Sequence, residues 1–303
     1  MQSLTVLVPG YNEEKSLLKS LNSILTAGKL WPGDFKVIFS DNHSTDSSLN
    51  IARELQKNEP CLEILTSQEN FGSRHNWGKL LLHVDSDLFC FIDAHDYIST
   101  NYFQQIANFL ENSESPLTVF GKEIMVIQKD FGYDEYPYPH KYFFNANSKI
   151  RFWQLVFYFY HNTECHSIFM TSSFKKDFIT ETRGLYFDHL LLFIALQKSN
   201  LKYVESSYYY RIYREVLGPE FSHKNDAGTT EDRWQRVKGK STEILSFQNV
   251  SREIFNASKP LLSFWEKPIA LLLLKLKYSQ SRSQFLLFRA VRYLFGKLTP
   301  WKT

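Results

Sequence analysis

The 303-residue chain contains only three cysteines, and they stand far apart with no CxxC pair. A disulfide framework needs an even set of cysteines at regular spacings, which this sequence does not offer. We therefore expect Cys61, Cys90 and Cys165 to be structural thiols in a protein of a reducing compartment, the cytoplasm.

The chain also lacks any uninterrupted apolar run near the roughly 18–20 residues that a membrane span requires. Residues 4–8 already form an apolar strand pattern, so we expect no signal peptide before them. The net charge of +3 is too small to indicate a nucleic-acid partner. Mixed charge and 43% hydrophobic residues indicate a globular protein.

Glycine-rich phosphate loops are missing as well. No GxGxxG follows the first predicted strand, and GxxxxGK[ST] does not occur. Hydride transfer on a dinucleotide and P-loop hydrolysis therefore lose support. A nucleotidyltransferase is disfavoured because its glycine-rich first loop, with Arg or Lys to bind a triphosphate, is absent.

What the first hundred residues do contain is an alternation of apolar strands with helices that carry an apolar stripe. This pattern predicts a mostly parallel α/β sheet flanked by helices, with right-handed crossovers. The predicted strands are residues 4–8, 35–39, 62–65 and 88–93. A polar cluster follows each strand. Because carboxyl ends of parallel strands meet at one edge, we expect these clusters to form one binding site.

The fourth strand ends on Asp93-Ala94-His95-Asp96, three groups able to hold a metal ion or a sugar. Side chains at i and i+2 of an extended chain point the same way, so Asp93 and His95 are predicted to share one face. The alternative is an ordinary polar turn in which Asp96 is the N-cap of the next helix.

Taken in order, these clusters resemble the motifs of family 2 glycosyltransferases, inverting enzymes of the GT-A fold that build bacterial capsule, lipopolysaccharide and other surface glycans. The matching segments are residues 8–14, 40–46, 70–72 and 93–96. The resemblance covers residues 4–98 well and 161–213 moderately. It implies a Rossmann-like GT-A sheet, a nucleotide-sugar donor, typically UDP-linked, and a glycan or lipid-linked acceptor.

The resemblance implies donor-binding roles for Pro9, Tyr11, Glu13, Asp41, Arg74, Asn76 and Asp93. Asp41 matches the acidic residue that accepts the ring N–H of the base, while Pro9 and Tyr11 would wall the base and ribose. Glu13 matches an acidic residue near the nucleoside. Arg74 or Asn76 would help to position the nucleotide. The alternative for Asp41, and for Asp46, is helix capping.

The family commonly shows Asp-x-Asp where this sequence has Asp93-x-His95-Asp96. The predicted cofactor is a divalent metal, Mn²⁺ or Mg²⁺, held by Asp93, His95 and Asp96; imidazole favours Mn²⁺. An Asp-x-His pair is also similar to the metal motif of polypeptide N-acetylgalactosaminyltransferases. Asp96 either replaces or supplements His95 as a ligand, and His95 as a mere hydrogen-bond donor is a further alternative.

In the second half, Asp188-His189 heads a leucine-rich helix where the family usually shows Glu-Asp. An inverting transfer needs one base to take the proton of the acceptor hydroxyl. We predict Asp188 for this role, with His189 as the alternative base or as a partner that sets the pKa of Asp188. Capping of the helix by Asp188 is the other alternative. His161, Glu164 and His166 are candidates for contacts with acceptor hydroxyls or for a third metal ligand.

The predicted organisation has three parts. Residues 1–115 form the nucleotide-sugar-binding half, and residues 116–217 the acceptor-binding and catalytic half of the same GT-A domain. Residues 218–303 form a flexible loop and a basic amphipathic helical tail. Such a tail is typical of a membrane-surface element, so we expect a cytoplasmic protein, peripheral at the inner face of the cell membrane. Packing of the tail on the catalytic domain or on a partner subunit is the alternative. Residues 130–148, rich in Pro and Tyr, are predicted to be a mobile loop on the acceptor side.

The sequence thus predicts a glycosyltransferase that moves a sugar from a nucleotide-sugar, typically a UDP-sugar, to a glycan or lipid-linked acceptor with inversion, in surface polysaccharide biosynthesis. The alternative from another class is a non-catalytic sugar-nucleotide-binding or scaffold subunit of a glycan-assembly complex. The histidines at positions 95 and 189, where acidic residues are usual, motivate that alternative.

Overall fold

Two β-sheets carry the fold in the computed structural model. It describes residues 2–113, 117–128, 132–138, 147–158, 163–174, 187–214, 246–277, 287–291 and 293. The first sheet has the strand order β3-β2-β1-β4-β8, and the second has the order β5-β9-β6-β7. The two sheets are joined where the backbones of Val119 and Ile168 exchange hydrogen bonds of 3.1 and 2.7 Å.

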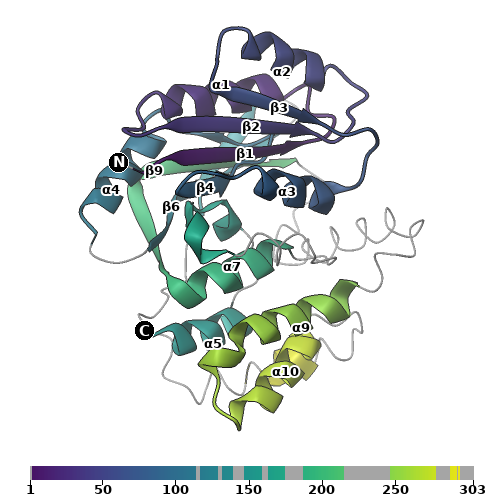
Figure 1. The fold of residues 1–303 in the computed structure, drawn as a ribbon, viewed down its shortest axis with the longest axis vertical. Helices are drawn as coiled ribbons and strands as arrows, with labels where there is room; N and C mark the ends of the chain where they lie inside the picture. The colour runs from purple at the N-terminus through teal and green to yellow at the C-terminus, as the bar shows by residue number, and fades with distance from the viewer. Residues whose placement is uncertain are drawn as a thin grey trace.

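The first sheet has four parallel strands, as the sequence predicts. They are β1 (Leu4–Gly10), β2 (Phe35–Asp41), β3 (Leu62–Thr66) and β4 (Leu88–Phe91). The short β8 (Phe169–Met170) adds an antiparallel edge. Helices α1 (Leu17–Gly28), α2 (Ser48–Gln56) and α3 (Ser73–Leu82) connect the parallel strands (Figure 1). The polar residues that follow β1, β2 and β4 therefore lie at one edge.

Two helices begin elsewhere than the sequence pattern predicts. Asn12, followed by two glutamates, is a good N-cap in the sequence, but the first helix begins at Leu17, since Asn12 has a left-handed backbone (φ 56) and its side chain bonds to another loop. The apolar run predicts a third helix from Lys79, and that helix begins earlier, at Ser73. At Asn12, hydrogen bonds between loops decide the local structure and not the apolar stripe.

The second sheet is antiparallel except for one parallel pair. Its strands are β5 (Tyr97–Ile98), β6 (Leu117–Gln128), β7 (Tyr133–Pro137) and β9 (Asn200–Arg214), with β6 and β9 parallel. The expectation of a loop over residues 130–148 is therefore wrong for residues 133–137, which pair with β6; residues 139–146 lie outside the described part. Tyrosines suit a strand, and Gly132 supplies a positive φ of 86° just before it.

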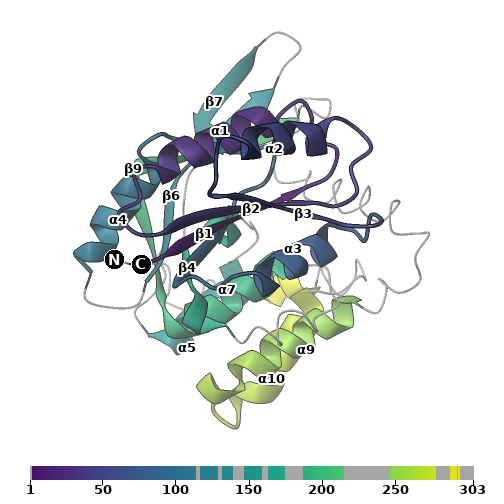
Figure 2. The same ribbon diagram turned by 45° about the horizontal axis from the view of Figure 1, so that its top comes forward.

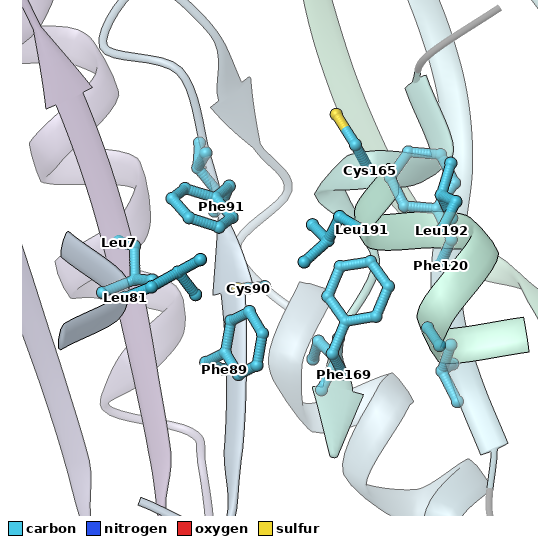
Figure 3. Close-up of a cluster of buried hydrophobic side chains, with 14 of the residues drawn as sticks. Leu7, Leu81, Phe89, Cys90, Phe91, Phe120, Cys165, Phe169, Leu191 and Leu192 are labelled. Atoms are coloured by element: carbon cyan, nitrogen blue, oxygen red, sulfur yellow. The ribbon is translucent and has the colours of Figure 1, made fainter. Parts of the chain in front are cut away.

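The hydrophobic core extends from α1 and the first sheet, through β4, to the helices of the second half. Figure 3 shows Phe89 and Phe91 of β4 beside Phe169 of β8 and Leu191 of α7 (Phe187–Lys198), and all four side chains are buried. A strand buried on both faces reads as a continuous apolar run, which is how residues 88–92 appear in the sequence. The end of β4, just before Asp93, is thus held in place by side chains that pack on both of its faces.

The C-terminal helices pack on this domain rather than standing free. Helix α9 (Ser246–Ser258) packs on α7, and α10 (Glu266–Lys277) packs on α9, at the end of the molecule away from α1 and α2 (Figures 1 and 2). The buried ammonium of Lys277 donates to the carbonyls of Leu155 and Val156 at 2.6 and 2.9 Å, near the end of α5 (Ser148–Tyr158). Of the predicted loop and tail at residues 218–303, residues 218–245, 278–286, 292 and 294–303 lie outside the described residues. Among the helices that are described, none is both long enough and apolar enough to cross a bilayer.

A glycine on β6 generates a test of the fold. An added Cβ at Gly121 would lie 2.6 Å from the carbonyl oxygen of Ser207 on β9 and 2.5 Å from a ring carbon of Tyr102 in α4 (Tyr102–Glu111). We expect Gly121→Ala to lower the free energy of unfolding by about 1–3 kcal/mol, because backbone cannot move aside cheaply. Urea denaturation measures it.

The matched control is Gly78→Ala in α3, where an added Cβ meets nothing within 4 Å. Alanine is favoured over glycine inside a helix by about 0.5–1 kcal/mol, so this variant should be as stable as wild type or slightly more stable. Equal stability of the two variants would contradict the close packing of β6 on β9.

Candidate active site

The loops after β1 and β2 are tied together by hydrogen bonds. The side chain of Asn12 accepts the backbone N–H of Thr45 at 2.8 Å, and the backbone N–H of Asn12 donates to the Ser44 hydroxyl at 2.9 Å. The backbone N–H of Glu14 donates to Asp46 at 3.0 Å. Asp46 also accepts the N–H of Ser48, the first residue of α2, although the N-cap of that helix is Ser47.

Asp41, the last residue of β2, is buried at this edge. Its Oδ2 accepts the backbone N–H of Ser44 at 3.1 Å. Its Oδ1 is buried and receives no hydrogen bond from any described residue. A buried carboxylate oxygen without a donor costs free energy, so native structures keep such an atom for a ligand, a water or a missing partner.

Both neighbours of Asp41 are bonded to asparagines that follow β3, one in the loop and one in α3. Asn76 bonds to Ser40 twice: it accepts the Ser40 hydroxyl at 2.5 Å and donates to the Ser40 carbonyl at 2.9 Å. The amide of Asn42 donates to Asn70 at 2.7 Å. Asn76 is therefore engaged with β2 beside Asp41, and its predicted contact with a nucleotide stays a prediction.

Three further donor-binding candidates lie as follows. Pro9 is buried in β1 directly opposite Ser40 of β2. Tyr11 follows the end of β1, and 42% of its surface is exposed. Arg74 belongs to α3, but its side chain lies outside the described part of the structure.

At the end of β4, two of the predicted metal ligands come together with a histidine from the second half. Ligand atoms of Asp93, Asp96 and His166 all lie within 4.8 Å of one another. His166 ends the 3-10 helix η1 (Thr163–His166), and it was one of three second-half candidates for a third ligand. His95 is not a member of this group.

His166 is oriented as a metal-ligating histidine would be. Its Nδ1 lies 3.0 Å from the carbonyl oxygen of Phe91, which can only accept, so Nδ1 carries a proton. Its Nε2 then faces Oδ2 of Asp93 at 3.6 Å, too far for a good hydrogen bond. A histidine whose one N–H bonds to a backbone carbonyl presents its other nitrogen to a metal in many metalloproteins.

Asp96 is held by β9 and is not a helix cap. It is fully buried, and it accepts the hydroxyl of Tyr209 at 2.7 Å and the backbone N–H of Ile212 at 2.8 Å. Burial and the charge of Asp93 raise the pKa of Asp96, against the opposing effects of His95, His166 and Arg211. Sequence reasoning missed Tyr209, which also stacks on His166 with ring centroids 5.0 Å apart. The alternation of inward and outward residues along β9 is the signal that could have revealed it.

His95 turns towards Glu13 instead. Its Nδ1 lies 3.2 Å from Oε1 of Glu13, and its Nε2 lies 3.9 Å from Asp96. Burial acts to lower the pKa of His95, but the hydrogen bond with Glu13 and the charges of Asp96 and Asp93 outweigh it and raise the pKa to about 9. A protonated imidazole has no lone pair for a metal, so the geometry favours an ion pair between His95 and Glu13.

Asp188 lies in the first turn of α7, where its Oδ1 accepts the backbone N–H of His189 at 2.9 Å. Burial raises the pKa of the Cys165 thiol in η1, and the carboxylates of Asp188 and Asp93 raise it further, so both carboxylates lie near that thiol. His189 and Glu164 are buried, and Glu164 accepts the Tyr203 hydroxyl at 3.0 Å. The remaining candidate, His161, lies outside the described residues.

The ion pair of His95 generates a test of the site. In the metal-free protein, we expect an NMR titration of the His95 ring to give a pKa of about 9. Glu13→Gln should lower that pKa towards 6.5, because it removes the negative partner. A group whose pKa is raised on folding stabilises the fold below its unfolded pKa of about 6.5. That contribution is lost as the pH rises through about 9.

The His95→Gln variant assigns the NMR resonance, because the signal of the His95 ring is missing from its spectrum. The stability difference between wild type and this variant should be largest below pH 6.5 and should shrink as the pH rises through about 9. A measured pKa of 6.5 or below for His95 would contradict the ion pair and would return the residue to the list of metal ligands.

Comparison with known proteins gives a family match that covers these loops. The family model of glycosyl transferase family 2 matches residues 5–176. Poly(ribitol-phosphate) β-N-acetylglucosaminyltransferase TarS of Staphylococcus aureus is 30% identical over 117 residues, which are 38% of this chain and 20% of TarS. Processive diacylglycerol β-glycosyltransferase of Mycoplasma pneumoniae is 26% identical over 133 residues, 42% of this chain and 38% of that protein. The matches thus span well under half the length of these relatives.

The fold has solved counterparts. The crystal structure of S. aureus TarS 1–349 in complex with UDP-GlcNAc superimposes with a TM-score of 0.60 and 21% identity, covering 93% of this chain and 74% of that one. The TarS 1–349 structure also superimposes, with a TM-score of 0.58. The predicted GT-A fold, with its central sheet between helices and its helical C-terminal part, is therefore confirmed.

The family match spans more than half of the chain and contains the loops after β1, β2 and β4, together with His166. The protein belongs to glycosyl transferase family 2.

Proposed function

We propose that the enzyme transfers a sugar from UDP to a hydroxyl group of a cell-surface polymer or lipid-linked glycan, with inversion at the anomeric carbon. The observation that carries the proposal is the buried, donor-free Oδ1 of Asp41 at the edge where the strand-end loops meet. In this proposal, residues 1–115 bind the donor and residues 116–217 bind the acceptor.

Uracil fits the Asp41 site in its chemistry. Its ring N–H is a donor that can pair with the free oxygen, while Oδ2 of Asp41 stays bonded to Ser44. Removing that ring N–H would leave a buried acceptor unpaired, which costs about 1–3 kcal/mol. Pro9 and Tyr11 supply apolar surface at the same edge for the base and ribose, and Glu13 lies beside them.

Asp93, Asp96 and His166 would hold the divalent metal, Mn²⁺ or Mg²⁺. The donor set of two carboxylates and one imidazole suits Mn²⁺ in particular. When bound, the ion would neutralise charge on the departing diphosphate. The free Nε2 of His166, facing Asp93, is the feature of this chain that fits a metal best.

Asp188 acts as the base in this proposal. It takes the proton of the acceptor hydroxyl while the oxygen bonds to the anomeric carbon and the bond from that carbon to the diphosphate breaks on the opposite face. His189, the next residue, remains the alternative base. Asp188 is supported by its place near Asp93 and Cys165.

The relatives narrow the acceptor class. TarS is named for poly(ribitol-phosphate), and a Bacillus spizizenii relative, 25% identical over 120 residues, is named poly(ribitol-phosphate) β-glucosyltransferase. The Mycoplasma relative is named for diacylglycerol. We therefore infer a surface polymer or a lipid-linked saccharide as acceptor, handled at the inner face of the cell membrane. A scaffold role without catalysis is the competing function.

Two variants separate binding from chemistry. Asp41→Asn places an N–H₂ group either towards the ring N–H of the base or towards the Ser44 N–H, and both of these groups are donors that need an acceptor. It should therefore weaken UDP binding at least about tenfold. Asp188→Asn should leave UDP binding unchanged and lower the release of UDP from a UDP-sugar with Mn²⁺ at least about a hundredfold. Thermal-shift titration with UDP and a coupled assay of UDP release measure the two effects.

Asp46→Asn is the matched control, since Asp46 lies five residues from Asp41 and accepts the backbone N–H of Ser48 at the start of α2. It should cost some stability and change neither readout by more than about twofold. The scaffold role would be favoured if the wild-type protein binds UDP but produces no UDP from a UDP-sugar with any acceptor. If Asp188→Asn transferred sugar normally, the base would be a different residue.

A further inference from the structure

Helix α10 and the turn before it expose a row of large apolar side chains. Phe264 and Trp265 are 76% and 78% exposed, the highest fractions among the described large apolar residues, and they contact each other edge to face. Ile269 and Leu272 are 49% and 57% exposed. Trp265, Ile269 and Leu272 repeat at i, i+4 and i+7, so they share one face of the helix.

This face is distinct from the one that packs on the protein. Ala270, Leu273 and Leu274 of α10 are buried, and Lys277 anchors the end of the helix on α5. At its start, Glu266 accepts hydrogen bonds from the backbone N–H and the hydroxyl of Ser263 and forms an ion pair with Lys149 at 2.7 Å. The turn that carries Phe264 and Trp265 is thus held rigidly while its aromatic rings point to solvent.

The surrounding sequence is strongly basic. After Glu266 there are eight Lys and Arg residues and no Asp or Glu. Because the whole chain carries +3, and these 37 residues carry +8, the preceding 266 residues carry −5. Lys275 and Arg289 are exposed in the described part of this region, and Lys259 is exposed in the turn just before it. The positive charge is therefore concentrated in the C-terminal stretch of the sequence, which begins within the exposed apolar row.

We propose that this face, centred on Phe264, Trp265, Ile269 and Leu272, docks the enzyme on an anionic phospholipid bilayer. Trp and Phe prefer the boundary between headgroups and acyl chains, and each nearby Lys or Arg adds attraction to anionic lipid. The inference does not rest on the donor assignment, because none of these residues takes part in the site at β1, β2 and β4.

A bilayer fits this face better than a second copy of the chain does. Two copies that met through it would bring their strongly basic regions together, and like charges repel. An anionic surface instead supplies the opposite charge. The apolar row is a narrow stripe along one helix, which suits shallow burial in the interface and not a span across the membrane.

Flotation of the full chain with lipid vesicles tests the proposal. In about 0.1 M salt, wild type should float with vesicles of phosphatidylcholine and phosphatidylglycerol, and about tenfold less with phosphatidylcholine alone. The double variant Phe264→Ser, Trp265→Ser should lower binding to the anionic vesicles at least about tenfold, because it removes the two rings that enter the interface. UDP release from a soluble UDP-sugar should stay unchanged.

The matched control removes two exposed aromatic rings elsewhere. Tyr133→Ser with Tyr136→Ser changes β7, where these tyrosines are 60% and 46% exposed, and it should bind vesicles as wild type does. Circular dichroism checks that both double variants fold.

A spectroscopic readout locates the contact. The shift of tryptophan emission to shorter wavelength on adding anionic vesicles should be lost in Trp265→Phe, although that variant still floats. Absence of wild-type binding to either vesicle would overturn the proposal. So would binding that the Phe264→Ser, Trp265→Ser variant retains, or a dimer that this variant abolishes without any vesicle binding.

Discussion

The rest of the site depends on the two hydrogen bonds that the buried carboxylate of Asp96 accepts from β9. Burying a charged group is costly unless it is fully hydrogen-bonded, and Asp96 meets this need with the Tyr209 hydroxyl and the Ile212 backbone N–H of β9. Because Asp96 comes from the turn after β4, this pair of bonds fastens the first sheet's catalytic edge to the second sheet. The fastened turn leaves Asp93 facing His166 and His95 facing Glu13. The anchored Asp96 thereby orients the side chains of Asp93 and His95 in the same turn.

Much of the first half could be predicted from the sequence. The parallel strands follow from apolar runs and the helices from their stripes, and the meeting of the strand-end clusters follows from topology. The sequence could not predict which residue of the Asp93–Asp96 turn faces the metal group and which forms the ion pair, because these roles depend on partners far away in the chain. Tyr209 lies 113 residues from Asp96, and Glu13 lies 82 residues before His95. Treating residues 93–96 as extended chain put Asp93 and His95 on one face, whereas the chain turns there, with the Asp96 N–H bonded to the Asp93 carbonyl at 3.0 Å. β7 was missed because Tyr and Pro suit both a strand and a loop.

The proposed metal site would let this family 2 member differ from the usual Asp-x-Asp pattern and still bind a divalent ion. His166 would bring a nitrogen ligand from the second half, while the ion pair of His95 with Glu13 links the loop after β4 to the loop after β1. At the C-terminal end, α10 is likewise anchored on one side and exposed on the other. Lys277 bonds α10 to α5, while the exposed apolar side chains and the nearby basic residues face outward, where a membrane with a lipid-linked acceptor would lie.

The central claim is that His166, and not His95, completes the metal site with Asp93 and Asp96. Pulsed electron paramagnetic resonance of the Mn²⁺ complex with UDP tests it directly, since a coordinated imidazole nitrogen couples to the Mn²⁺ electron spin. The account predicts a nitrogen coupling in wild type and in His95→Gln, and its loss in His166→Ala, with UDP still bound. A coupling that survives in His166→Ala and disappears in His95→Gln would contradict the account.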